Sequence, residues 1–519
     1  MGEGRMNAPF PDTIAGYGAV RPFGGAFNEQ GVVMRAPVAV RCVGPKIGKR
    51  LPSIRAAIEA CNLTSGGTVS FHHHLRNGDG VLNAVMEEVA QLGLRDITVA
   101  ASSLFSVHAP LVEHIRNGVV TAIRTGYMAG PVADAVASGM LKQPAVMQTH
   151  GGRARSLESG ETQIDVAFIA APAVDIYGNI NGVDGPSACG SLGYPIVDAK
   201  TARYVVAITD YLIAYPACPI AISQDYVDHV VLVDSIGDSR QIASGTTRPT
   251  SDPVGLQIAE TAARVIEASG LLIEGFSFQT GAGGVSLAVA SSLANTMARR
   301  GVRGSFAAGG ITAMIVDMLD AGLFRTLLDV QCFDLKAVES FRSNSAHQMM
   351  SASMYANPWN RGAVVNRLDT MILGAAEVDL DFNVNVSTAT DGRIIGGSGG
   401  HSDTAAGAKL ALVTTRLVAG SYPKIVERVR TITTPGETID AVVTEAGIAV
   451  NPRRGDLIDR LVAAGLPVVS IQKLLKLART ASGDRSGGLV EVDRRIVAIV
   501  QYRDGSVIDV IRQSGSPRV

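Results

Sequence analysis

The sequence IIGGSGGHSDTAAGA, residues 394–408, holds the turn around which the rest of the chain is arranged. Two β-branched residues run into a cluster of glycines, and small helix-compatible residues follow, so the pattern predicts a strand end, a glycine turn and a helix start. Glycine adopts positive φ without steric cost and lets backbone N–H groups approach a ligand closely. Such amides at the start of a helix can bind an anion or an oxyanion. By itself the motif is equally compatible with a purely structural loop.

The same organisation occurs once more in the first half of the chain. Residues 164–185 align with residues 378–399 at one constant offset, which pairs Asp165 with Asp379 and Gly185 with Gly399. Further segments repeat in the same order: 67–91 with 272–299, 93–103 with 301–310, 111–120 with 315–324, and 227–235 with 439–447. We therefore predict two homologous, open α/β domains, residues 46–250 and 251–485, with mainly parallel sheets covered by helices.

The two ends of the chain and the junction between its halves differ from these domains. Residues 1–45 show no periodicity and are interpreted as an N-terminal arm that could wrap around a partner. The segment 245–252, GTTRPTSD, is rich in turn formers and predicts the linker. Residues 486–519 predict a C-terminal β-hairpin, because apolar runs flank Asp504-Gly505, a pair that suits a tight primed turn.

The composition is that of a globular protein, with 46% hydrophobic and 18% charged residues among 519. The net charge is −1 and no basic stripe carries interleaved aromatics, so we expect no nucleic-acid partner. The most apolar window, residues 204–222, is interrupted by Asp210 and two prolines; we interpret it as buried strands and expect no membrane span. The N-terminus lacks the pattern of a secretory signal, and we expect a cytoplasmic protein.

The cysteines are scattered and form no CxxC pair: Cys42, Cys61, Cys189, Cys218 and Cys332. We expect reduced thiols rather than a disulfide framework or a zinc site. No sequence pattern supplies a base for Cys189, so a structural thiol is favoured over a nucleophile there. We predict no metal and no tightly bound cofactor.

The first-domain loop HHHLRNGDG, residues 72–80, follows a predicted strand, and ligands of such folds bind at the carboxyl ends of strands. In an extended segment His72 and His74 share one face and His73 takes the other. Arg76 offers a bidentate fork to a carboxylate. Histidines that bind a metal, or that merely pack a strand edge, are the alternatives. The residues predicted to bind a polyanionic small molecule are His72, His74, Arg76 and Asn77.

The second-domain loops are small and rich in amides: QTGAGG at residues 279–284 and GGSGG at residues 396–400. Such loops suit a thioester carbonyl that becomes an oxyanion, or the phosphate of a carrier arm. His401 follows the second loop and joins the predicted substrate site. Glu445 ends a buried strand and is a base or orienter, or else an edge carboxylate. The residues predicted to bind the thioester arm are Gly281, Gly283, Gly396, Gly397 and Gly399.

These segments resemble a family of CoA-transferases built of two tandem open α/β domains. GSGGHSDTAAGA is similar to the GxGGQxD loop of that family, EVDLDFNVNV to the strand before it, and ITTPGETIDAVVTEAGIA to its VTT…VDYVVTEYGIA segment. Within the family the chain most resembles the citrate lyase alpha subunits. The segments that fit these subunits are PFGGAF, SFHHHLRNGD, TGAGGVSLAV, GGITAMIVDMLDAG and YRDGSVIDVIRQ. The resemblance covers nearly the whole chain.

The resemblance implies an enzyme that transfers the acyl-carrier thiol from acetyl to citrate, giving a citryl thioester and acetate. The implied substrates are citrate and an acetyl thioester, either of CoA or of the CoA-derived arm of an acyl carrier protein. The implied partners are the acyl carrier (gamma) and lyase (beta) subunits, and the chain is expected to form a homo-oligomer.

One departure from the family bears on mechanism. Many members carry a nucleophilic glutamate where this chain has AAGGITAM, near Gly309 and Gly310, and a covalent glutamyl–CoA intermediate needs such a carboxylate. Glu445 is the one nearby substitute. The departure favours a ternary-complex route, in which a citrate carboxylate attacks the acetyl thioester to form a mixed anhydride. The amides expected to stabilise the oxyanion are those of Gly283, Gly284, Gly399 and Gly400.

Three other functions stay open at this stage. The chain could be a CoA-transferase or acyl-CoA hydrolase that uses free CoA with another carboxylic acid, such as citramalate. It could be a non-catalytic scaffold for carrier and lyase subunits, although two sets of amide-presenting loops argue against that. A sugar-phosphate isomerase on a similar fold is disfavoured, because the loops hold no clear lysine–carboxylate pair.

Overall fold

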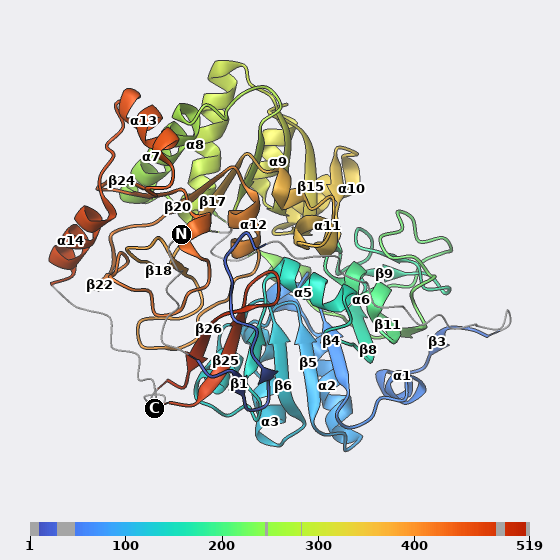
Figure 1. Ribbon diagram of the computed structural model, residues 1–519. Helices are drawn as coiled ribbons and strands as arrows, with labels where there is room; N and C mark the ends of the chain where they lie inside the picture. Colours follow the sequence, from blue (N-terminus) through green and yellow to red (C-terminus); the bar gives the residue numbers. More distant parts are fainter. Residues whose placement is uncertain (1–9, 29–46, 244–247, 282, 484–493, 515–519) are drawn as a thin grey trace.

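The computed structural model describes residues 10–28, 47–243, 248–281, 283–483 and 494–514. Two large sheets, each covered by helices, lie one above the other in Figure 1. The predicted boundaries at 45/46 and 485/486, and residues 245–247 of the predicted linker, lie outside the described residues. None of the described helices is both long and apolar enough to cross a membrane.

The first sheet has ten strands in the order β26-β25-β7-β6-β5-β4-β8-β11-β12-β3. Neighbours are parallel except for the antiparallel pair β25 and β26. The strands are β3 (Arg50–Leu51), β4 (Thr68–Phe71), β5 (Ile97–Ala101), β6 (Val120–Thr125), β7 (Ala145–Met147), β8 (Val166–Ala170), β11 (Tyr204–Thr209), β12 (His229–Leu232), β25 (Ile496–Gln501) and β26 (Val507–Arg512). The helices of this half are α1 (Ile54–Ala60), α2 (Val81–Gln91), α3 (Leu111–Arg116), α4 (Pro131–Ala137), α5 (His150–Glu158) and α6 (Pro195–Thr201).

The second sheet has eight strands in the order β16-β15-β14-β13-β17-β20-β23-β24, and only β23 and β24 are antiparallel. The strands are β13 (Ser277–Thr280), β14 (Gly304–Ile311), β15 (Phe324–Cys332), β16 (His347–Met349), β17 (Thr370–Gly374), β20 (Leu410–Thr414), β23 (Ala441–Thr444) and β24 (Gly447–Val450). The helices are α7 (Pro253–Ala268), α8 (Gly284–Arg300), α9 (Ala313–Asp320), α10 (Leu335–Ser343), α11 (Ala352–Ala356), α12 (His401–Gly407), α13 (Gly455–Ala463) and α14 (Ile471–Ser482). Two-stranded ladders are β1 (Thr13–Ile14) with β2 (Gly18–Ala19), β9 (Ala173–Val174) with β10 (Ile180–Asn181), β18 (Glu377–Val378) with β19 (Val384–Asn385), and β21 (Val418–Ala419) with β22 (Tyr422–Pro423).

The two halves repeat one topology. The run β7-β6-β5-β4-β8-β11-β12 of the first sheet corresponds, strand for strand, to β16-β15-β14-β13-β17-β20-β23 of the second. The small ladders β9/β10 and β18/β19 also occupy matching places in the chain. The predicted fold class, two tandem open α/β units with mainly parallel sheets, is therefore confirmed.

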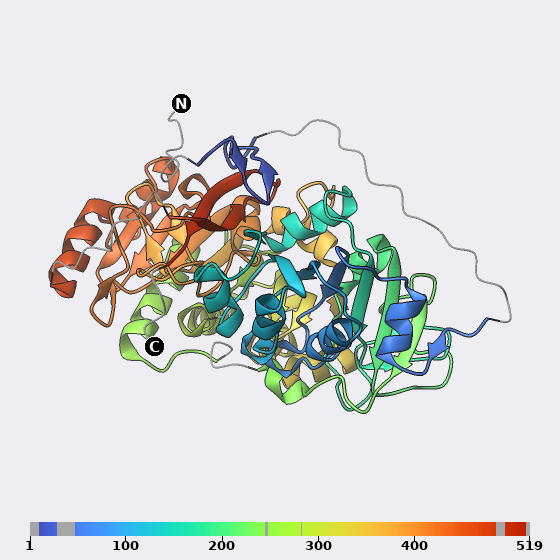
Figure 2. The ribbon, with the colours of Figure 1, turned by 90° about the horizontal axis from the view of Figure 1, so that it is seen from below.

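The described residues nearest the two ends, 10–28 and 494–514, pack on the first half. The C-terminal hairpin adds β25 alongside β7, so it belongs to the first sheet in space although it comes last in the chain. The described part of the N-terminal arm lies along the hairpin, where Phe23 N–H donates to the Val507 carbonyl at 3.0 Å and Val507 N–H donates to the Arg21 carbonyl at 2.8 Å (Figure 2). This part of the arm wraps around its own chain.

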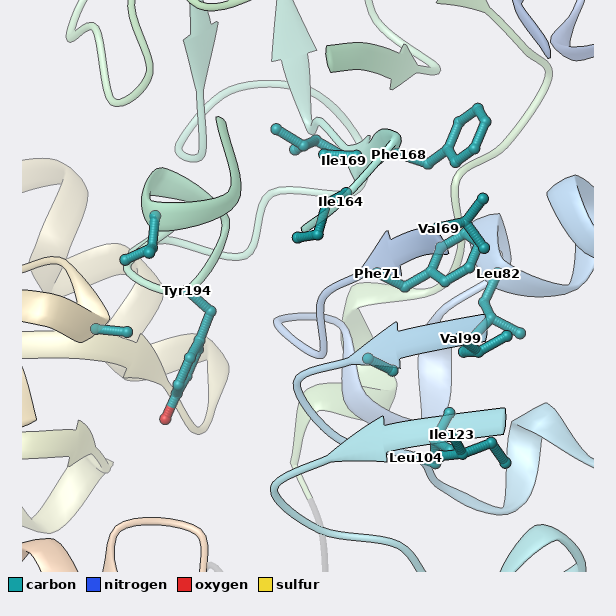
Figure 3. Close-up of a cluster of buried hydrophobic side chains, with 14 of the residues drawn as sticks. Val69, Phe71, Leu82, Val99, Leu104, Ile123, Ile164, Phe168, Ile169 and Tyr194 are labelled. Atoms are coloured by element: carbon teal, nitrogen blue, oxygen red, sulfur yellow. The ribbon is translucent and has the colours of Figure 1, made fainter. Parts of the chain in front are cut away.

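The core of the first half lies between helices and central strands (Figure 3). Val69, Phe71 and Phe168 come from the adjacent strands β4 and β8, and the two phenyl rings stack with centroids 5.9 Å apart. Burying each such side chain contributes about 1.5–3 kcal/mol. Tyr194, just before α6, directs its hydroxyl away from this core, beside the yellow ribbon of the second half (Figure 3).

Two element predictions were wrong. The strand expected over residues 272–278 begins only at Ser277, because Gly275 adopts φ +86° in a turn closed by Phe276 N–H and the Ile273 carbonyl. The window 204–222 contains β11 only; beyond it the chain forms a loop that exposes aromatic side chains such as Tyr211.

Candidate active site

The carboxyl ends of the two sheets meet, and the glycine turn 396–400 packs on the first half there. The N–H of His150 donates to the Gly399 carbonyl at 2.7 Å, and the N–H of Gly399 donates to the Gly126 carbonyl at 3.0 Å. A Cβ on Gly397 would lie 2.5 Å from that same Gly126 oxygen, so the backbones are close enough to require glycine. The glycine turn of the second half therefore packs directly on the ends of β6 and β7, and the residues at this junction are hereafter called the layer.

Asp403, on α12 of the second half, forms hydrogen bonds to the first half in this layer. Its Oδ2 accepts a hydrogen bond from Gly151 N–H at 2.9 Å and its Oδ1 accepts one from the Thr149 hydroxyl at 2.8 Å. Burial raises the pKa of Asp403 to about 6, although the charge of Arg503, 3.6 Å away, opposes the shift. The residues on both sides of His150 are thus tied to helix α12.

Arg76 lies in the same layer. Its guanidinium carbon is 5.5 Å from the ring centroid of Phe105 in the first half and 4.9 Å from that of Phe333, which follows β15 in the second half. Nη1 is buried, and no described residue accepts a hydrogen bond from it. Burial lowers the pKa of Arg76. The backbone of Arg76 adopts φ +52°, which is a strained conformation for a residue other than glycine. A strained, desolvated cation between two aromatic rings fits an anionic ligand.

Three rings pack together beside Arg76, and the His73 and His150 rings among them are stacked. His73 lies 5.6 Å from His150 and 4.5 Å from Tyr194, and His150 lies 4.7 Å from Tyr194, all between centroids. Burial, together with the charge of nearby Arg153, lowers the pKa of His150 to about 3. Burial likewise holds the pKa of His73 well below its usual range. Both imidazoles are therefore neutral at pH 7.

The predicted alternation of the three histidines is observed, and it gives His72 and His74 protein partners. Their rings stack on each other with centroids 6.4 Å apart, whereas the His73 ring stacks on that of His150. His72 Nε2 lies 3.1 Å from the carboxylate of Asp198, which also forms a salt bridge with Arg153. Arg153 and His72 hold the pKa of this buried carboxyl below its usual range. His74 Nε2 donates to the Ala170 carbonyl at 2.6 Å. The substrate-binding role of His72 and His74 stays a prediction.

The structure leaves no room for a nucleophilic side chain at Gly309 or Gly310. A Cβ on Gly309 would lie 2.5 Å from the Gln279 amide, and one on Gly310 would lie 2.3 Å from the Phe333 ring. The Gln279 amide donates to the Tyr355 hydroxyl at 2.7 Å, and a Cβ on Gly400 would lie 2.4 Å from that hydroxyl. Glycine at these positions lets three strands and the glycine turn pack on one another.

Two of the predicted amide donors are occupied. Gly399 N–H binds the Gly126 carbonyl, and Gly281 N–H binds the Ile372 carbonyl at 3.0 Å. Gly283 precedes α8 with φ +154°, and the Gly284 carbonyl accepts from Thr250 N–H at 2.9 Å. A thioester oxygen would therefore have to use other donors than the amides of Gly281 and Gly399.

The remaining predicted residues lie at different places. Asn77 is exposed on the 72–80 loop. His401 Nε2 donates to the Gly374 carbonyl at 2.9 Å and Nδ1 accepts from the Thr434 hydroxyl at 2.7 Å, so its ring is held by the second half. The Glu445 carboxylate accepts hydrogen bonds from Leu417 N–H at 3.1 and 3.2 Å. Leu417 follows β20 and Glu445 follows β23, the strand next to β20. Glu445 stands three strands from β13 in the sheet order.

Sequence reasoning missed His73, His150, Tyr194 and Asp403 as members of the layer. His150 opens a helix after β7, just as Ala352 opens one after β16, so the duplication could have placed it at the carboxyl end of a strand. Its contact with Gly399, in the other half of the chain, has no local signal.

Comparison with known proteins agrees with this architecture. The family model described as citrate lyase, alpha subunit, matches residues 48–514. The citrate lyase alpha chain of Escherichia coli K12 is 49% identical over 465 residues, covering 90% of this chain and 91% of that one. The Klebsiella pneumoniae alpha chain is 47% identical over 483 residues, covering 93% and 95%.

This chain belongs to the citrate lyase alpha-subunit family. The membership confirms the family predicted from sequence and its enzyme class, a transferase. A solved structure from Streptococcus mutans, described as the putative alpha subunit of citrate lyase in complex with citrate, is 46% identical with a TM-score of 0.92, covering 95% of this chain and 96% of that one. A 4-hydroxybutyrate CoA-transferase from Porphyromonas gingivalis, 18% identical with a TM-score of 0.54 over 83% and 97%, shares the fold alone.

Proposed function

We propose that this chain converts citrate and an acetyl thioester into a citryl thioester and acetate. Family membership and the citrate in the Streptococcus mutans relative support the proposal. It extends to the setting: a cytoplasmic homo-oligomer in a citrate lyase complex, beside an acyl carrier subunit that bears the thioester and a lyase subunit that cleaves the product.

The main structural observation behind the proposal is the guanidinium of Arg76. A buried cation without an anion is costly, and a carboxylate that forms two charge-assisted hydrogen bonds to it offsets that cost. Arg76 lies between Phe105 and Phe333, at the junction of the two halves, so an acid held there lies beside the glycine turn that faces His150.

The chemistry that fits is direct transfer in a ternary complex. A citrate carboxylate attacks the acetyl thioester carbonyl, the C–S bond breaks, and a mixed anhydride and a thiolate form. The thiolate then attacks the citryl carbonyl of the anhydride and releases acetate. No net proton is consumed, and holding both reactants together can supply about 7–11 kcal/mol of the barrier.

The crowded glycines support this route over a covalent enzyme intermediate. A glutamate at Gly309 or Gly310 would collide with Gln279 or Phe333. Glu445 is engaged by Leu417 N–H at the far side of the sheet. A carboxylate nucleophile must reach the thioester carbonyl, and citrate at Arg76 is the better candidate.

The test is a transferase assay with purified chain, acetyl-carrier or acetyl-CoA, and citrate. Arg76→Met should raise the citrate KM by about 10²-fold, the value of one buried charge-assisted contact, and leave the KM of the acetyl thioester unchanged. Arg325→Met is the matched control, because Arg325 is exposed and paired with Glu274 at the opposite end of β15. Unchanged citrate kinetics in Arg76→Met would remove the basis of the proposal.

The alternative function uses free CoA with another acid. The same assay separates the two, since citramalate turnover above citrate turnover, or hydrolysis of acetyl-CoA without any acid, would favour it.

A further inference from the structure

We propose that His150 is a catalytic residue, whose Nε2–H donates a hydrogen bond to the thioester carbonyl oxygen as that oxygen becomes negative. This role rests on the proposed function and names a side-chain donor in addition to the glycine amides that the sequence predicted. The tetrahedral species formed by carboxylate attack carries its new charge on that oxygen, and a fixed donor there lowers the barrier.

The position of His150 fits this role. The residue lies between His73 on the Arg76 side and Gly399 on the side of the glycine turn. A Cβ on Gly399 would lie 3.3 Å from His150 Nε2, so only glycine leaves that nitrogen uncovered. His150 is half-buried, whereas its neighbours Thr149 and Gly151 are buried. A thioester held against the turn would therefore meet this edge of the ring.

The ring and the backbone of His150 are both held in place. The His73 ring stacks on the His150 ring, the Tyr194 ring packs against it at a tilt, and the backbone N–H of His150 donates to the Gly399 carbonyl. Asp403 binds both Thr149 and Gly151, the residues before and after it. A donor that is already positioned costs no reorganisation when the charge develops.

The proton belongs on Nε2 in this setting. Nδ1 is buried and no described residue hydrogen-bonds to it, and a buried N–H without an acceptor is rarer than a buried acceptor without a donor. Among the described residues, the side chains that contact or act on the ring are His73, Tyr194 and Arg153, none of which is negatively charged at pH 7. A neutral imidazole donor is what the reaction needs, because the carboxylate attacks without losing a proton and the thiolate leaves and returns without gaining one.

The test compares three variants in the citrate-dependent transferase assay. His150→Phe keeps a stacking ring and removes the donor, and should lower kcat by about 10²–10³-fold with little change in the citrate KM. His150→Gln restores a neutral donor and should recover at least ten-fold of that loss, about 1.4 kcal/mol, with the wild-type pH profile. His114→Gln, a buried histidine on α3, is the matched control and should keep wild-type kcat.

Several results would overturn the role. It is wrong if His150→Phe keeps wild-type kcat, if His150→Gln is as slow as the phenylalanine variant, or if glutamine abolishes one limb of the pH profile. ¹⁵N NMR of the wild-type chain provides a readout that needs no active variant: at pH 7 the ring should be neutral and protonated on Nε2, and an imidazolium or an Nδ1–H tautomer contradicts the role. A wild-type chain without citrate-dependent exchange would refute the proposed function itself; exchange that survives His150→Phe would refute only this role.

Discussion

The carboxylate of Asp403 accepts a hydrogen bond from the backbone N–H of Gly151 at 2.9 Å, across the junction of the two halves. The same carboxylate lies 3.6 Å from Arg503 in the turn of the C-terminal hairpin. Three segments that are distant in sequence therefore meet at one buried acid. This contact sets how the glycine turn faces His150.

The stability of the protein should depend on pH through Asp403. Its pKa is raised from 3.8 to about 6, so between these values the folded state holds the proton more tightly than the unfolded chain. The stability contribution of this group is greatest below pH 4 and is lost as the pH rises through 6. Between pH 4.5 and 8, wild type should lose about 2 kcal/mol more than Asp403→Asn, because asparagine cannot ionise.

Denaturant titrations at both pH values measure this difference. Asp391→Asn is the control, since that exposed carboxylate pairs with Arg393 and its pKa is lowered rather than raised. Parallel losses in wild type and Asp403→Asn would show that Asp403 ionises normally.

Gly309 should tolerate no side chain. Gly309→Ala places a Cβ 2.5 Å from the Gln279 amide at φ +101°, whereas Gly322→Ala has φ +72° and nothing within 4 Å. Both variants bear the cost of positive φ, and Gly309→Ala should lose about 1–3 kcal/mol more through overpacking. It should also lower kcat, because Gln279 binds the Tyr355 hydroxyl beside the glycine turn. Equal stability and equal kcat in the two variants would contradict the packing described.

Glu445 should be dispensable for chemistry. Glu445→Gln keeps an oxygen for Leu417 N–H and removes any nucleophile, so we expect near-wild-type kcat. Hydroxylamine or borohydride added during turnover should leave the wild-type enzyme unlabelled at this residue. A Glu445 adduct, together with a dead glutamine variant, would replace the direct route with a covalent one.

Asp198 should matter for stability and not for citrate. Asp198→Asn leaves Arg153 without its buried partner and should cost about 3–5 kcal/mol, with an unchanged citrate KM. Asp96→Asn is the control, because its pair with Lys142 is exposed and should contribute about 0–1 kcal/mol. A raised citrate KM in Asp198→Asn would instead support the predicted role of His72 in substrate binding.

The sequence was sufficient for the repeated fold because glycines and apolar runs recur in register. Gly178 and Gly392, which align in the duplication, both adopt positive φ, at +96° and +86°. The same signal does not exist for the site, whose members meet only after the two sheets pack. Arg76 could be predicted from its own chemistry, as a bidentate fork for a carboxylate in the loop after a predicted strand.

The histidines show where such prediction stops. Alternation separated His73 from His72 and His74, yet no local pattern says which face turns toward the second half. The Gln331 amide on β15, 258 residues away, donates to the His73 carbonyl at 2.9 Å, a contact between the two halves that no local pattern predicts. His150 and Asp403 were missed for the same reason.

The most direct test of the account is a calorimetric titration of citrate into wild type, Arg76→Met and Arg325→Met, with no thioester present. The account predicts that wild type and Arg325→Met bind citrate equally and that Arg76→Met binds it about 10²-fold more weakly, as expected for a lost buried charge partner. Equal citrate affinity in all three proteins would contradict the placement of the acid between the two halves.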